Sequence, residues 1–165
     1  MSVLNGIQDS VQQVAEAISI ALGVEVEIVD DKLNIVGGTG PYHDQIGQKE
    51  EGGDVEGDYL YARVLRSGVT QYVADAKTDA AYDITGRGYT VSGELAEICT
   101  PIILDGRIIG IIGLVAFSEE QKRILADKNR NMTDFVEKMA DLLAAKADQQ
   151  ETLENVEVSR NEMST

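Results

Sequence analysis

Few residues in this 165-residue chain belong to the types that catalyse reactions or bind metals. It has one histidine, His43, and one cysteine, Cys99, so neither a two-histidine metal site nor a CxxC zinc or redox pair can form. A Ser-His-Asp triad would have to be built around a histidine in a glycine-rich loop, and no Gly-x-Ser-x-Gly motif is present. We therefore expect no metal, no cofactor and no enzymatic activity, and we interpret His43 as a surface loop residue.

Two glycine motifs look at first like phosphate-binding loops. They are residues 37–40 (GGTG) and residues 86–88 (GRG). Neither is followed by Gly-Lys-Ser/Thr, and His43 stands where the first motif would need its third glycine. We interpret both motifs as turns.

Two residues are candidates for contacting a small molecule. Arg87 stands alone among acidic and neutral residues, and a guanidinium can hold a carboxylate in two parallel hydrogen bonds. The alternative is a solvent-exposed ion pair with Asp83 or Glu94. Cys99 lies in an alternating segment, on the face opposite Thr100, so it is either an inert buried thiol or part of a pocket wall.

The charge of the chain excludes some partners. It has 14 Lys plus Arg and 29 Asp plus Glu, which gives a formal net charge of −15. This charge opposes the phosphate neutralisation that drives nucleic-acid binding, so we expect no direct nucleic-acid contact. The start of the chain lacks a basic segment followed by an apolar one, and residues 108–117, the longest apolar run, fall well short of the ~20 needed to span a bilayer. We predict a cytoplasmic location and no membrane span.

The first half of the chain predicts a helix, a hairpin, a second helix and a short strand. Six apolar residues spaced by three and four form one helical seam that ends at Gly23: Leu4, Ile7, Val11, Val14, Ile18 and Ala21. This helix either packs on its own core or pairs with a second copy of the chain. Residues 24–28 and 33–35 alternate as a hairpin with one wet face, which residues 37–41 break. A loop or short helix over 42–58, a helix over 59–65 that Gly68 stops, and a strand over 70–73 follow.

The second half of the chain predicts a long loop, a second hairpin and a long helix. Residues 74–94 show no periodicity, whereas 96–104 and 107–117 read as strands around the turn signal Asp105-Gly106. Gly110 and Gly113 remove side chains from opposite faces of the last strand, which admits a closely packed helix or leaves space for a ligand. Ser118 and Gln121 form a capping box that begins the helix. Its apolar residues fall on two stripes, one of which can cover the sheet while the other faces a partner: Met132, Phe135, Met139 and Leu142 on the first, and Val136, Ala140 and Leu143 on the second.

This order of elements resembles a PAS- or GAF-type sensor domain. The closer resemblance is to the amino-terminal sensor region of sigma-54-dependent transcriptional regulators. It is carried by residues 96–102 (AEICTPI), 105–117 (DGRIIGIIGLVAF) and 119–121 (EEQ), with weaker likeness at 26–31 and 38–40. Some relatives carry several cysteines in the loop before the last hairpin that look suited to an iron–sulfur cluster. Residues 74–94 have no cysteine, so we expect no cluster here.

The resemblance implies an α/β (α+β) fold, with a five- or six-stranded, mainly antiparallel sheet and the amino- and carboxy-terminal helices on one face. In such folds a cavity lies between the sheet and the variable loops. We therefore expect a small polar or anionic effector to contact six residues: Tyr61, Tyr72, Arg87, Tyr89, Cys99 and Thr100.

The family also implies a function in signal transduction and transcription regulation. We expect residues 1–146 to form the sensor domain and residues 147–165 a coiled-coil connector or disordered tail. Effector binding would shift the exit helix in a homodimer and so alter an ATPase and a DNA-binding domain, neither of which fits in this chain. The alternatives are a ligand-free dimerisation or docking module and, on the same fold, a small thiol-dependent enzyme.

Overall fold

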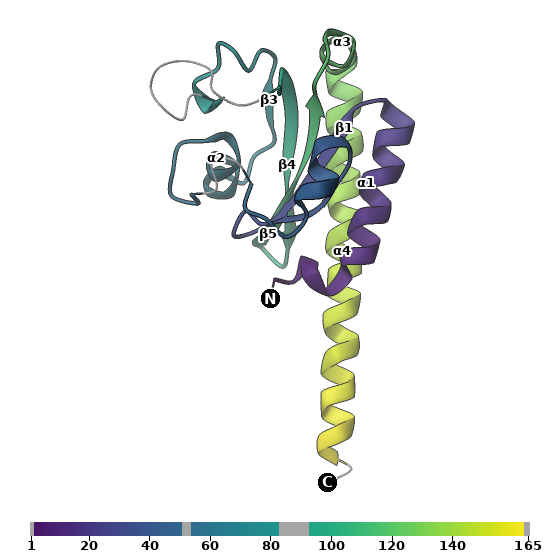
Figure 1. Ribbon diagram of the computed structural model, residues 1–165. Helices are drawn as coiled ribbons and strands as arrows, with labels where there is room; N and C mark the ends of the chain where they lie inside the picture. The colour runs from purple at the N-terminus through teal and green to yellow at the C-terminus, as the bar shows by residue number, and fades with distance from the viewer. Residues whose placement is uncertain (1, 51–53, 83–92, 164–165) are drawn as a thin grey trace.

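The computed structural model describes the whole chain except residues 1, 51–53, 83–92 and 164–165 (Figure 1). Its centre is a five-stranded antiparallel sheet in the order β2-β1-β5-β4-β3. The strands are β1 (Glu25–Asp30), β2 (Ile35–Gly38), β3 (Gln71–Val73), β4 (Ala96–Leu104) and β5 (Arg107–Ala116). The predicted α/β fold with a mainly antiparallel sheet is confirmed.

Helices cover one face of this sheet, which we call the helix face. They are η1 (Leu4–Ile7), α1 (Gln8–Leu22), α3 (Glu119–Asp127) and α4 (Asn129–Met163). Figure 1 shows α1 and α4 side by side there, and α4 extending well beyond the sheet. The opposite face, which we call the loop face, is covered by α2 (Leu60–Ser67) and η3 (Ala80–Tyr82), while η2 (Gly40–Gln45) packs at the β2 edge.

The apolar seam of the first helix packs on its own domain. Leu4, Ile7, Val11 and Ile18 are buried in the core of the helix face together with β1 and β4 residues. Val14 is only half-buried, and Ala21 is exposed. Most residues of the seam therefore pack within their own domain. Val14 and Ala21 lie on the side of α1 that faces α4.

Local chemistry sets the ends and turns that the sequence predicted. Gly23 and Gly68 end α1 and α2 with φ values of 74° and 67°, a backbone conformation that favours glycine. Asp105 and Gly106 join β4 to β5 with φ values of 51° and 78°. Positive φ at both central residues is what a two-residue type I′ hairpin turn requires.

The first hairpin runs further than predicted. Residues 37 and 38, expected to break it, belong to β2. The Gln12 side chain both donates to the Gly38 carbonyl and accepts from the Gly38 amide, each at 2.9 Å. A Cβ at Gly37 would lie 2.9 Å from Val11 Cγ1, so these glycines let α1 approach the edge of the sheet.

The predicted long exit helix is two helices. Ser118 caps α3 by accepting from the Gln121 amide at 3.1 Å, and the Gln121 side chain accepts from the Phe117 amide at 2.8 Å. The chain then leaves the helical conformation at Lys128 before α4 begins. No glycine or proline marks this break, so helical periodicity alone could not predict it. α4 continues without interruption across residue 146 to Met163, and the division of the chain at that residue stays a prediction.

Candidate ligand site

The centre of the loop face has a gap in its row of side chains. Glu27 of β1 and Cys99 of β4 are both paired with Gly113 of β5, which lies between them. Paired residues on neighbouring strands point to the same face of a sheet. Gly113 therefore leaves a recess between the Glu27 carboxyl and the Cys99 thiol.

Tyr61 of α2 reaches into this recess. A Cβ at Gly113 would overlap both the Tyr61 hydroxyl and Glu97 Oε2. On the helix face, a Cβ at Gly110 would overlap Leu4 Cδ1 and the Val29 carbonyl oxygen. Of the two interpretations of these glycines, close helix packing holds at Gly110, whereas Gly113 makes room for polar groups.

Those polar groups form what we call the acid–tyrosine cluster. Its members share the loop face and are nearly inaccessible to solvent: Glu27, Glu94, Glu97, Tyr42, Tyr61 and Tyr82. The Tyr42 hydroxyl donates to Glu94 Oε1, and the Tyr82 hydroxyl donates to Glu97 Oε1. Among the residues that the structure describes, every buried residue of a charged type is acidic.

Burial raises the pKa of the Glu97 carboxyl well above its ordinary value, and repulsion from Glu94 raises it further. The Tyr61 and Tyr82 hydroxyls lie close enough to this carboxyl to oppose that rise in pKa. Burial, with the nearby Glu27 and Glu97, likewise raises the pKa of Tyr61, which stays neutral. The cluster can therefore hold or release a proton at Glu97, while its tyrosines act as hydrogen-bonding groups.

Cys99 lies at the edge of the same cluster. Its side chain is buried, and burial followed by repulsion from Glu97 raises the pKa of its thiol well above the ordinary value. A nucleophilic cysteine needs the thiolate form, which this environment disfavours. Cys99 is therefore part of a wall rather than a reactive centre.

The predicted site residues do not converge on one place. Tyr61 and Cys99 share the loop face, in a common buried cluster. Tyr72 is paired with Ile98, which lies in the core of the helix face, and Thr100 lines a hollow there with Glu137 of α4. Neighbouring residues of a strand point to opposite faces, so Thr100 cannot join Cys99.

The two remaining predicted residues, Arg87 and Tyr89, lie outside the described residues. Ligand contact by any of the six residues stays a prediction. Tyr72 is 37% exposed, and the Thr100 hydroxyl lies 2.8 Å from that of Thr70. Tyr72 is therefore at the surface, and Thr100 takes part in hydrogen bonding on the helix face.

Sequence reasoning missed most of the acid–tyrosine cluster. The alternation around Glu27 predicts a strand with one solvent-exposed face, yet Glu27 is only 2% exposed. Glu97 gave the same alternating signal between Ala96 and Ile98. Alternation identifies a polar face but cannot distinguish solvent from a polar interior. The signal that could have helped is Gly113 opposite both strands, because a missing side chain makes space for polar ones.

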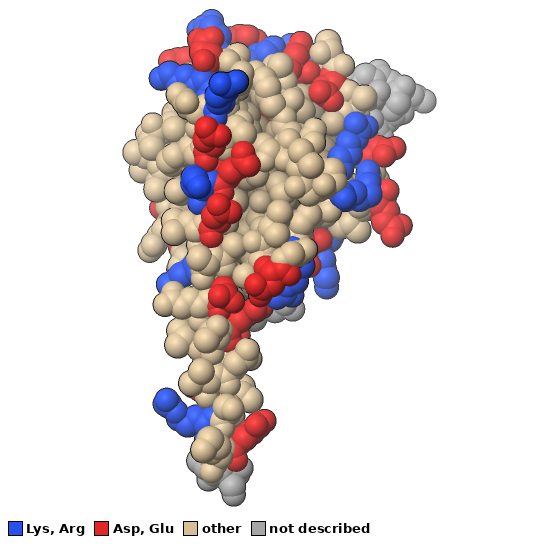
Figure 2. All heavy atoms as spheres, turned by 180° about the vertical axis from the view of Figure 1, so that it is seen from behind, with Lys and Arg blue, Asp and Glu red and all other residues tan. Residues whose placement is uncertain are grey.

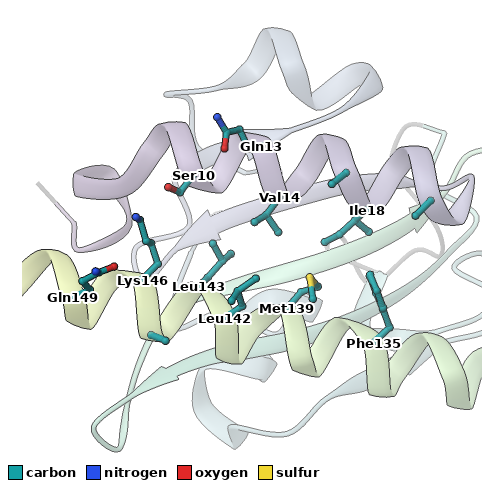
Figure 3. Close-up of a pocket in the computed structure, with 13 residues that line it drawn as sticks. Ser10, Gln13, Val14, Ile18, Phe135, Met139, Leu142, Leu143, Lys146 and Gln149 are labelled. Carbon is teal, nitrogen blue, oxygen red and sulfur yellow. The ribbon is translucent and has the colours of Figure 1, made fainter.

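A second feature is an apolar groove of about 730 Å³ between α1 and α4. Figure 3 shows Val14 and Ile18 of α1 pointing toward Phe135, Met139 and Leu143 of α4. Val136, Ala140 and Leu143, the second predicted stripe, are buried against the sheet. Phe135 and Met139 of the first stripe are half-buried, and Leu142 is 54% exposed.

Neither a metal site nor a membrane span is found in the part of the chain that the structure describes. No three His, Cys, Asp or Glu side chains there are placed to hold a metal ion together. No helix within the described ranges combines the length and apolarity needed to cross a bilayer.

Comparison with known proteins supports the sensor-domain resemblance. The chain is 31% identical over 148 residues to an Escherichia coli (strain K12) protein provisionally named as a uric acid sigma-54-dependent transcriptional regulator, UacR. The match covers 88% of this chain and 24% of that regulator, so the chain spans about a quarter of its relative's length. No family model matches the chain.

Solved structures agree on the fold. The GAF domain of a phosphoenolpyruvate-protein phosphotransferase from Coxiella burnetii superposes with a TM-score of 0.63 at 16% identity, covering 90% of this chain and 86% of that one. The chain thus has a GAF-type fold, and most of its length is similar to part of a sigma-54-dependent transcriptional regulator. The same fold is found in an enzyme, the free methionine-R-sulfoxide reductase of Neisseria meningitidis, whose structure was solved in complex with its substrate. It superposes with a TM-score of 0.60 at 16% identity, covering 88% of this chain and 80% of the reductase.

Proposed function

We propose that this GAF domain senses a small-molecule effector on its loop face and passes the signal through α4 in a homodimer. The observation that carries the proposal is the acid–tyrosine cluster, whose Tyr61 hydroxyl and Glu97 carboxyl fill the space that the missing side chain of Gly113 leaves. Buried polar groups lower the stability of a fold unless they form hydrogen bonds. Clusters of this kind are therefore expected where they serve a function such as ligand binding.

A path from this cluster to α4 runs through one strand. Glu97 and Cys99 of β4 face the cluster, while Ile98 and Ile102 of the same strand belong to the core that contains Val136 and Leu143 of α4. α4 packs chiefly against β4. A change in the position of β4 when an effector binds would therefore move α4 directly.

The homodimer is supported by the apolar surface of the terminal helices. The groove between α1 and α4 continues toward the projecting part of α4, where Leu153 and Val156 are 58% and 51% exposed. Figure 2 shows a largely uncharged stretch on that part of the helix. Exposed apolar surface of this extent is typical of protein–protein contacts.

The effector proposal is tested by binding. The name of the Escherichia coli relative makes uric acid and related oxidised purines the first compounds to try. We expect at least one of them to raise the unfolding temperature of the domain and to bind measurably by isothermal titration calorimetry. If no compound of a broad metabolite panel does either, a ligand-free dimerisation or docking module becomes the better description.

The buried, protonated Cys99 thiol speaks against the enzyme alternative. Cys99→Ser tests it, because a thiol-dependent reductase would lose all turnover with this substitution. We expect no reductase activity on free methionine sulfoxide in either form of the protein. A cytoplasmic location and an output through a transcription complex are parts of the same proposal.

A further inference from the structure

One face of α4 carries a continuous stripe of uncharged residues, which we call the pairing seam. Its members are spaced alternately by three and four residues, from the groove beside α1 to the tip of the helix: Leu142, Ala145, Gln149, Thr152, Val156, Ser159 and Met163. Each of them is exposed and lines either that groove or a second hollow of about 600 Å³ on the projecting part of α4. This spacing is the heptad pattern of helices that pair with other helices.

The residues on the two sides of the pairing seam differ in charge. Each side carries charge of a single sign: Asp141, Asp148, Asn155 and Glu162 on one side, and Lys146, Leu153 and Arg160 on the other. In the described part of the chain, no ion pair joins Asp141, Asp148 or Lys146 to another residue. Asp141 and Lys146 are five residues apart, whereas neighbours on one helix are three or four apart, so these two do not pair within their own helix. Their charges are available to a second molecule.

This separation of charge selects the orientation of a paired helix. In a parallel pair of helices, each side of the seam faces the opposite side of the partner helix, so Asp141 of one copy faces Lys146 of the other. In an antiparallel pair that covers the whole seam, each side faces its own kind. Asp141 would then lie near Glu162 of the second copy, and Lys146 near Arg160, and like charges at close range repel.

We propose, on the basis of the homodimer proposed above, that the second copy lies parallel and in register, with the two α4 helices in contact along the pairing seam. Asp141 of each copy faces Lys146 of the other, and Gln149 meets its own counterpart. A polar residue at such a position fixes the register of a helix pair and lowers its stability. The paired arms are therefore held weakly, which suits a contact that a movement of α4 opens and closes.

Cross-linking of single cysteines tests the orientation. Cys99, the one cysteine of the chain, is replaced by Ser, and the whole chain then carries Thr152→Cys or Ser159→Cys in the seam, or Glu154→Cys on the opposite side of α4. In a parallel pair both seam cysteines lie beside their own counterparts. A short bis-maleimide cross-linker should therefore convert both seam variants to covalent dimers, and the Glu154→Cys control should react at least tenfold less.

The outcomes separate this inference from the homodimer itself. In an antiparallel pair only a residue on the twofold axis meets its own counterpart, so at most one of the two seam variants would react. Cross-linking of one or neither of them, in a chain that analytical ultracentrifugation shows to be dimeric, overturns the parallel arrangement and leaves the homodimer standing. A chain that is monomeric at micromolar concentration overturns both.

A charge exchange in the chain with Cys99 retained tests the residue pair. Asp141→Lys places a lysine opposite Lys146 of the second copy and should weaken self-association about fivefold at low ionic strength, because two attractive contacts become repulsive. Adding Lys146→Asp should restore the wild-type affinity. Glu137→Lys, the same change of charge on α4 away from the seam, is the control and should have a smaller effect. Unchanged association of Asp141→Lys, or no recovery in the double variant, overturns the assignment.

Discussion

Glu97 combines deep burial with a raised pKa, and this combination makes stability depend on pH. Below its ordinary pKa of 4.5 the carboxyl is protonated in both the folded and the unfolded chain. Above 4.5 the unfolded chain loses this proton while the folded one keeps it. Folding stability therefore falls as the pH rises, until the pH passes the raised pKa of the folded state.

Glu97→Gln should remove this dependence. The variant should become more stable than the wild type by roughly 1 kcal/mol or more at pH 8, because each tenfold change in proton affinity corresponds to about 1.4 kcal/mol. The difference should shrink toward pH 4.5. Thermal unfolding of both proteins at several pH values measures it, and a difference that does not change with pH would contradict the assignment of a protonated Glu97.

Gly113 is the residue whose missing side chain lets the cluster assemble. Gly113→Ala places a Cβ against the Tyr61 hydroxyl and Glu97 Oε2, and overpacking of this kind costs about 1–3 kcal/mol. In a Tyr61→Phe background one of the two overlaps disappears, so the same substitution should cost less. Urea unfolding of the two single variants and the double variant measures this coupling. Strictly additive effects would show that Tyr61 does not occupy the recess.

The helices and turns differ in how far their own residues determine them. Ser118 caps α3 through its hydroxyl, and Ser118→Ala should lower the free energy of unfolding by about 1 kcal/mol. Ser159→Ala, in the exposed interior of α4, is the matched control and should be close to neutral. Chemical denaturation separates the two, and equal effects would mean that the cap does not support the helix.

These elements also show why part of the fold could be predicted. Gly23, Gly68 and Asp105-Gly106 act through their own backbone conformations, so their positions in the sequence were enough to locate the helix ends and the hairpin. The break at Lys128 has no glycine or proline to mark it, so the sequence pattern gave no sign of it. The burial of Glu27 and Glu97 likewise depends on segments far away in the chain, including Tyr61 and Tyr82.

The whole molecule presents its two terminal helices on one side and its polar cluster on the other, with the sheet between them. This arrangement separates the surface proposed for pairing from the surface proposed for effector binding. In the proposed function β4 couples the two surfaces, so a substitution on one side should alter the other only through β4 and α4. The two stripes of the exit helix predicted that one stripe covers the sheet while the other faces a partner, and Val136, Ala140 and Leu143 are the stripe that is buried against the sheet.

Leu142 tests the pairing surface. It lines the groove between α1 and α4 and is 54% exposed, whereas Ile20 is 86% exposed and does not line the groove. Leu142→Glu should weaken self-association at least tenfold, because it places a charge in an apolar contact. Ile20→Glu should leave self-association unchanged. Analytical ultracentrifugation at micromolar concentration measures both, and a wild-type chain that is monomeric at these concentrations would refute the homodimer.

Beyond Glu151, whose carboxylate pairs with Arg107 of β5 at 3.0 Å, α4 runs on to Met163 as an exposed helix. At about 1.5 Å per residue this arm is about 18 Å long, so a tilt of about 10° at its base swings its tip by about 3 Å. In the proposed signal transfer, a small change in the tilt of α4 where it touches β4 would therefore become a larger displacement at the far end of the helix, where it could change which side chains meet.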